Sequence, residues 1–295
     1  MEYYLYLIIN GLVVGSIYSL VALGFVVIYK ATQVVNFAQG ELLMVGAYIC
    51  FALTIQAQIP FVLSFLLTLG FSVILGLAIE RFALRPLIGE SHISVIMLTI
   101  GLSSVLKAVV QLFWGTNVRV FPKVLPADPV PVFGLPVAPA YIAAMILAVL
   151  LFTIFTAFFK FSRTGIAMRA TAFDQQAAQS MGISIKRVFA LSWCIACIVS
   201  SVGGIVLGNI NGINAQLGHM GLKVFPAVIL GGLDSLLGAA VGGLVIGILE
   251  NVCDGVAKQI LGLGGVKDVA AFVVLVIILM LKPYGLFGTK EIERV

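Results

Sequence analysis

The sequence is poor in charged residues. Asp, Glu, Lys and Arg together make up 10% of its 295 residues, whereas apolar residues make up 61% and the mean hydropathy is +1.18. A soluble protein of ordinary composition carries about 25% charged residues. This shortage excludes a soluble globular protein and predicts an all-α, polytopic integral membrane protein. We expect a single transmembrane domain over residues 1–295.

Side chains that serve catalysis and metal binding are also scarce. There are two histidines, His92 and His219, and four cysteines. Cys194 and Cys197 have C-x-x-C spacing, but they lie in an apolar stretch without a second pair, and a zinc site needs about four ligands. No H-E-x-x-H or G-x-S-x-G motif occurs. The sequence therefore predicts neither an enzyme nor a metal or cofactor site.

The chain also lacks a G-x-x-x-x-G-K-[ST] phosphate-binding loop. A transporter with this sequence that uses ATP must therefore borrow an ATPase. The alternative is a secondary transporter driven by an ion gradient, which usually needs ionisable residues in mid-membrane; this sequence has few. The net charge of +5 comes from basic residues in loops, with no basic stripe between exposed aromatics, so we expect no nucleic-acid partner.

Apolar runs long enough to cross a bilayer recur along the chain, since about 20 apolar residues span the hydrocarbon core. The uninterrupted candidates are 3–28, 60–79, 92–114, 138–159, 188–208, 237–254 and 267–281. Two further segments, 34–55 and 220–233, are apolar but interrupted, and either one can cross or re-enter. We expect about eight to ten transmembrane helices. The first run has no basic residue before it and no cleavage site after it, so we expect it to remain as a span.

The basic residues predict the orientation of these spans. If all nine segments cross with the N-terminus outside, eleven basic residues fall on the cytoplasmic side: Lys30, Arg81, Arg85, Lys160, Arg163, Arg169, Lys186, Arg187, Lys282, Lys290 and Arg294. Five fall outside: Arg119, Lys123, Lys223, Lys258 and Lys267. This ratio favours the proposed orientation. Lys107 lies within a span, near enough to its outer end to snorkel.

The longest polar stretch, 160–187, is the first candidate functional element. It holds five of the seventeen basic residues and a single acid, Asp174, so it faces the cytoplasm. Its Ala-rich run predicts one helix over 164–182, which Gly182 would stop at C′. One face of that helix would carry Ile166, Ala170, Phe173, Ala177 and Met181. A short cytoplasmic helix of this kind is a candidate docking element for a soluble partner.

The two interrupted segments form the second candidate site. The first contains Asn36, Gln39, Gly40 and Glu41, and the second contains Gly231 and Gly232. Helices broken at similar places in two halves indicate a transporter built from repeats, and broken backbone at depth must line a cavity or lie within protein. We predict that these six residues border a translocation pathway. Glu41 either faces a cavity within the bilayer or lies at the cytoplasmic interface.

Glycine spacing predicts close helix packing. G-x-x-x-G pairs occur at Gly11/Gly15, Gly204/Gly208, Gly238/Gly242 and Gly243/Gly247. Such pairs let helices approach closely. With 31 glycines in the chain, chance matches are expected, so the pairs indicate a tightly packed bundle and do not identify which helices touch.

Several motifs resemble one known family. They are I-N-G-L-V-V-G-S-I-Y-S-L-V-A-L-G-F-V-V-I-Y (9–29), V-N-F-A-Q-G-E-L-L-M-V-G-A-Y (35–48), W-G-T-N (114–117), R-A-T-A-F-D-Q-Q-A-A-Q-S-M-G-I-S-I-K-R-V (169–188), L-G-G-L-D-S (230–235) and L-V-I-G-I-L-E-N (244–251). In this order, over nearly the whole chain, they resemble the permease of the high-affinity branched-chain amino-acid ABC importer, the H-type subunit more than its M-type sister. Leu237 departs from the pattern, because many relatives have Pro there.

The resemblance implies an ABC-importer permease fold that carries Leu, Ile and Val across the cytoplasmic membrane. It implies four kinds of partner: the lipid bilayer, a sister M-type permease, two cytoplasmic ATP-binding subunits that bind the ATP, and an extracytoplasmic substrate-binding protein. The 160–187 loop would be the coupling loop, with the ATPase contact at Ala170, Phe173, Asp174, Ala177 and Gly182. Urea and short-chain amide permeases share the same motifs, so such a substrate remains the alternative.

Overall fold

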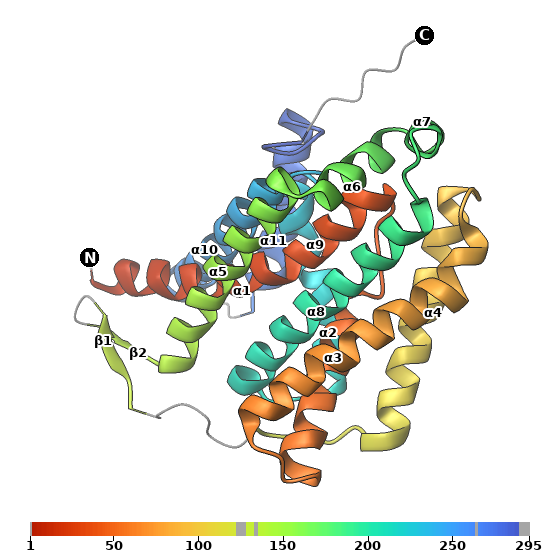
Figure 1. The fold of residues 1–295 in the computed structure, drawn as a ribbon. Coiled ribbons are helices and arrows are strands. Elements are labelled where there is room, and N and C mark those ends of the chain that lie inside the picture. Colours follow the sequence, from red (N-terminus) through yellow and green to blue (C-terminus); the bar gives the residue numbers. More distant parts are fainter. Residues whose placement is uncertain (1, 122–127, 133–134, 263–264, 289–295) are drawn as a thin grey trace.

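The computed structural model describes the chain except for residues 1, 122–127, 133–134, 263–264 and 289–295. Helices dominate the described part (Figure 1): α1 (Glu2–Thr32), α2 (Gln39–Phe51), α3 (Phe61–Ile79), α4 (His92–Trp114), α5 (Pro139–Phe161), α6 (Arg163–Phe173), α7 (Gln175–Ser180), α8 (Ile185–Asn211), α9 (His219–Gly231), α10 (Leu236–Leu261) and α11 (Lys267–Leu281). The all-α class is confirmed. The described residues also include one short antiparallel pair of strands, β1 (Val130–Val132) and β2 (Leu135–Val137).

Short irregular helices extend or link these elements. Two π-helical turns, Ala52–Gln56 and Glu80–Leu84, continue α2 and α3, and a 3-10 turn, Arg85–Leu87, follows the second. Another 3-10 turn, Ala215–Gly218, leads into α9. With these extensions, seven helices among the described residues are long and apolar enough to cross a membrane, and Val269–Leu281 is a shorter apolar helix. The chain is a multi-pass membrane protein, as the composition predicts.

Helix α1 lies in the middle of the bundle and packs most extensively on α10. Glycines make that contact possible. A Cβ atom on Gly11 would lie 2.6 Å from the Cα of Ile248, and one on Gly15 would lie 2.7 Å from the Cα of Leu244. Gly247 faces Gly15 in the same way from α10. The two backbones therefore touch, and van der Waals contact between them holds the bundle where apolar burial provides little drive.

The two interrupted segments are broken helices. Between α1 and α2 the chain leaves the helix at Gln33, which has φ +56°, and α2 begins only at Gln39. In the second segment α9 has 13 residues, which at 1.5 Å per residue is about 20 Å, too short for a full span. Each segment therefore combines a non-helical part with a short helix, as the sequence predicts.

The beginnings of α2 and α9 meet inside the bundle. A Cβ atom on Gly221 would lie 2.6 Å from the backbone nitrogen of Gly40. From this point α2 runs toward the end of α4, where the rings of Tyr48 and Trp114 are 5.5 Å apart. Helix α9 runs the opposite way, toward the end of α1, where Lys30 Nζ donates a 2.7 Å hydrogen bond to the backbone oxygen of Asp234. The two short helices thus diverge from a common point to opposite ends of the bundle.

The loop at 160–187 forms two helices, so the expectation of one helix over 164–182 is wrong. Asp174 has φ −155° and ψ 111°, which ends α6. Its carboxylate Oδ1 accepts hydrogen bonds from the backbone nitrogens of Gln176 (2.8 Å) and Ala177 (2.9 Å) and so caps α7. Aspartate favours this arrangement because its side chain replaces the missing backbone acceptors of a first turn. Gly182 follows α7 with φ +82°, which is the C′ position expected for it.

Labelling from each side of the membrane tests the orientation. In a cysteine-free background, Ser162→Cys and Ser184→Cys should react with a membrane-impermeant maleimide only in inverted vesicles, because the basic α6–α7 end faces the cytoplasm. Ala127, the loop position that the sequence places outside, lies beyond the described residues; Lys258 is exposed at the opposite end of α10 from Ser235. Lys258→Cys should label in intact cells. Labelling of position 162 in intact cells would reverse the topology.

Candidate functional site

An exposed apolar surface marks the cytoplasmic loop. Phe173 is 95% exposed at the end of α6, and Met181 is 83% exposed just after α7. Ile166 and Ala177 are also exposed, whereas Ala170 is only partly so. We call Ile166, Phe173, Ala177 and Met181 the α6–α7 surface. Since exposed apolar side chains, with an aromatic among them, are typical of an interaction site, this is the part of the loop suited to docking.

The opposite side of α6 is anchored to the bundle. A Cβ atom on Gly165 would lie 2.7 Å from the Cα of Phe159 in α5. Met168 and Thr171 are fully buried, and Ala178 of α7 is also buried. The loop is therefore packed onto α5 and α8, so a force applied to it reaches the membrane helices.

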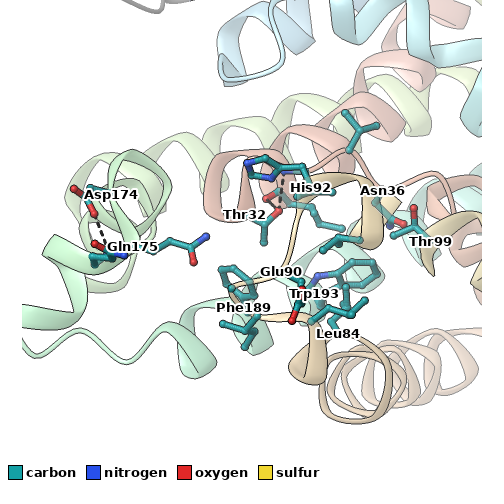
Figure 2. A pocket seen from close by; sticks show the side chains of 18 residues that line it. Thr32, Asn36, Leu84, Glu90, His92, Thr99, Asp174, Gln175, Phe189 and Trp193 are labelled. Atoms are coloured by element: carbon teal, nitrogen blue, oxygen red, sulfur yellow. Dashed lines mark hydrogen bonds between the residues drawn. The ribbon is translucent and has the colours of Figure 1, made fainter. Parts of the chain in front are cut away.

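A cavity of about 310 Å³ lies beneath α7. Figure 2 shows Asp174 and Gln175 on one side of it and Asn36 and Thr99 on the other, with His92 and Trp193 between them. The cavity thus connects the cytoplasmic loop with the segment that precedes α2. Gln175, which a continuous helix would place off the contact face, lines this cavity because the chain breaks at Asp174.

Asn36 and Gln39, two of the predicted pathway residues, are linked by hydrogen bonds at the start of α2. Asn36 Oδ1 accepts from the backbone nitrogen of Ala38 (3.0 Å), and Asn36 Nδ2 donates to Gln39 Oε1 (3.2 Å). Gln39 Nε2 donates in turn to Ser200 Oγ of α8 (2.6 Å). A Cβ atom on Gly24 would collide with this amide, so glycine makes room for it in α1. Asn36 reaches the cavity, whereas Gln39 is fully buried and holds the first turn of α2 in position.

Glu41 lies inside the bundle. Its side chain is 9% exposed, and its Oε1 would be 3.0 Å from a Cβ atom on Gly218. Lys107 of α4 and His219 of α9 are the charged or ionisable groups that act on it. Glu41 is therefore enclosed by the protein, as an ionisable side chain within a bilayer has to be.

The side chain of Lys107 does not point where the sequence predicted. Its Nζ lies 3.2 Å from His219 Nε2, so it turns toward the start of α9 instead of snorkelling to the membrane surface. The sequence contains a signal for this contact, because an ionisable residue within a span usually faces the bundle or a cavity and pairs with another group.

Gly231 and Gly232 do not join the other predicted pathway residues. They lie at the far end of α9, about 18 Å from its first residue at 1.5 Å per residue. Gly231 packs against Gly238, and Gly232 against Gly288. The glycines that meet Gly40 are Gly218 and Gly221. The amide-rich run at 209–219 precedes this contact, but nothing in the sequence identifies its partner.

Comparison with known proteins gives the family. The family described as "Branched-chain amino acid transport system / permease component" matches residues 7–281. The chain belongs to this family. The permease is 34% identical to the high-affinity branched-chain amino acid transport system permease protein BraD of Pseudomonas aeruginosa, over 99% of this chain and 98% of BraD. It is 32% identical to the corresponding protein LivH of Escherichia coli K12, over 99% and 98%.

The chain was also compared with solved structures. The permease matches "PsaBC from Streptococcus pneumoniae in complex with Fab" with a TM-score of 0.49 and 12% identity, over 91% of this chain and 89% of that chain. The sequence relatives carry the assignment. They confirm the family resemblance seen in the motifs, and they are transport permeases, a class of protein that is not enzymatic.

Proposed function

We propose that this permease is a membrane subunit of an ATP-driven importer of branched-chain amino acids, Leu, Ile and Val. Two relatives of 34% and 32% identity carry that substrate class in their names. The observation that carries the proposal is the pair of short helices, α2 and α9, which begin at a common polar point inside the bundle. Discontinuous helices of this kind form substrate sites near the bilayer midplane in transporters.

The partners follow from two surfaces. The α6–α7 surface, with Phe173 at its centre, would dock cytoplasmic ATPase subunits as an apolar contact in a groove. His219 is exposed on the isolated chain at the depth of Glu41, and an ionisable side chain does not face lipid there. A sister permease covering that side would enclose the pathway between two chains. An extracytoplasmic binding protein would deliver the substrate to the opposite end.

The cavity beneath α7 offers a physical route for coupling. One wall belongs to α7, at Asp174 and Gln175, and the other to the segment before α2, at Asn36. Movement of the docked loop would change the shape of this cavity and shift the start of α2, which Gln39 ties to α8. Coupling between distant sites requires such an element with two arrangements, and the short segment at residues 33–38 is suited to that role.

Reconstituted transport tests the proposal. The permease with its sister permease, ATPases and binding protein should accumulate radiolabelled leucine in liposomes only when ATP is supplied on the ATPase side. ATP-driven uptake of urea or acetamide in place of leucine would assign the chain to the amide permeases. Uptake driven by an ion gradient, without ATP and without the ATPases, would make it a secondary transporter.

A further inference from the structure

Three ionisable side chains from three helices meet where α2 and α9 begin. Glu41 is the third residue of α2, Lys107 lies in α4, and His219 is the first residue of α9. Lys107 Nζ is 3.2 Å from His219 Nε2, and Glu41 experiences the charges of both groups. Ionisable groups gathered at this depth are rare in membrane proteins and typically mark a substrate or ion route.

The opposite charges in this cluster do not neutralise each other by direct contact. A lysine ammonium carries three N–H donors and no acceptor, so Lys107 can contact His219 Nε2 and still bind another acceptor. Lys107 then remains a cation with further donors to use. Glu41 and Lys107 attract each other, but among the described residues these two side chains form no direct salt bridge. A cationic and an anionic side chain from two different helices therefore lie near each other, an arrangement that suits a ligand with both charges.

The two helix N-termini beside the cluster also suit a ligand with a carboxylate. Both short helices point their N-termini toward the cluster, and their positive ends favour a carboxylate. Leu222, three residues after His219 on α9 and so on the same side of that helix, has an exposed apolar side chain. Gly101 and Ser104 of α4 are also exposed and carry little or no side chain.

We propose that Glu41, Lys107 and His219 form an intramembrane binding site for a zwitterionic α-amino acid in transit. The substrate carboxylate contacts Lys107, which His219 positions, together with the positive end of α9. The substrate ammonium contacts Glu41, and its aliphatic side chain lies on Leu222. The site rests on the proposed function and deepens it: it selects a molecule with two opposite charges, whereas neutral urea satisfies neither group.

A competition experiment on the wild-type importer tests the site without any substitution. Tritiated leucine is bound to the detergent-purified permease–ATPase assembly in the absence of the binding protein. Leucine should compete at least about tenfold better than 4-methylpentanoate, which lacks the ammonium, and than 3-methylbutylamine, which lacks the carboxylate, because a site built for a polar group rejects the analogue without it. Equal competition by all three, or no saturable leucine binding, overturns the proposal.

Substitutions then assign each half of the ligand. With Glu41→Gln the advantage of leucine over 4-methylpentanoate should vanish, and with Lys107→Gln its advantage over 3-methylbutylamine should vanish. Lys258→Gln, which removes an exposed lysine far from the cluster, should keep both preferences. If both cluster variants keep both preferences, the three side chains only join α2, α4 and α9. ATP-dependent leucine uptake with equal competition would reject the site alone, whereas absence of uptake would reject the proposed function.

Discussion

Replacing Ala177 with Arg should leave the permease folded in the membrane but separate it from its ATPases. Ala177 is exposed on α7, and Phe173 and Met181, four residues before and after it in the chain, are 95% and 83% exposed. A docked partner would cover this side, and a long cation placed in a desolvated contact costs about 2–5 kcal/mol. We expect the ATPases to be lost on purification of the complex and substrate-stimulated ATP hydrolysis to be abolished. The measurements are co-purification through a tag on the permease and phosphate release.

Two further variants make this result specific. Phe173→Asp should have the same effect, because it removes the aromatic side chain expected to act as the anchor of the contact. Ser184→Arg adds the same charge as Ala177→Arg at an exposed position beyond Gly182, where the side chain caps nothing, and should retain the ATPases. If all three variants behave like the wild type, α6 and α7 are only a connection between spans and the docking role must be abandoned.

Gly15→Leu should have the largest effect on folding. The site is buried in the α1–α10 contact, where even a Cβ atom would lie 2.7 Å from the Cα of Leu244. Because the obstacle is backbone, no side chain can turn away, and α1 and α10 must separate along the central contact of the bundle. Overpacking of this kind costs about 1–3 kcal/mol and often more when backbones must move. We expect a sharp fall in monodisperse protein on size exclusion in detergent and a lower melting temperature.

A matched glycine provides the control. Gly70 of α3 is exposed, and a Cβ atom there would meet nothing within 4 Å. Gly70→Leu makes the same chemical change in another span and should leave yield and melting temperature close to those of the wild type. Equal losses at positions 15 and 70 would attribute the effect to glycine replacement in general and not to the α1–α10 contact.

Properties that depend on local composition could be predicted from the sequence. Hydropathy identified the spans because the hydrocarbon core acts on each segment separately, and the charge count located the 160–187 loop for the same reason. The interrupted helices were also visible, since Asn36, Gln39 and Gly40 break an apolar run within the chain itself. The family motifs added the transport assignment, which the relatives confirm.

Contacts between segments far apart in the chain came only from the tertiary structure. Three of the four G-x-x-x-G spacings are close contacts at both glycines, but their partners differ: Gly11 and Gly15 meet α10, Gly238 and Gly242 meet α9, and Gly243 and Gly247 meet α1. In the fourth pair Gly204 meets the backbone of α2, whereas Gly208 meets the side chains of Ile213 and Phe121. The spacing states that a backbone can be approached closely. The spacing does not indicate which helix makes the close approach.

The candidate site shows the same division. The sequence alone singled out Glu41, but it could not show that Lys107 contacts His219, 112 positions away. It also did not show that α6 ends at Asp174, whose side chain caps α7 instead. Gly231 and Gly232 were grouped with Gly40 by their similar sequence context, yet α9 carries them to the other end of the bundle. The sequence by itself determined a membrane permease with two broken helices and a cytoplasmic loop, because these are local consequences of hydropathy, charge and backbone preference. Only the tertiary structure decided which charges face one another within the membrane, because that depends on how the helices pack.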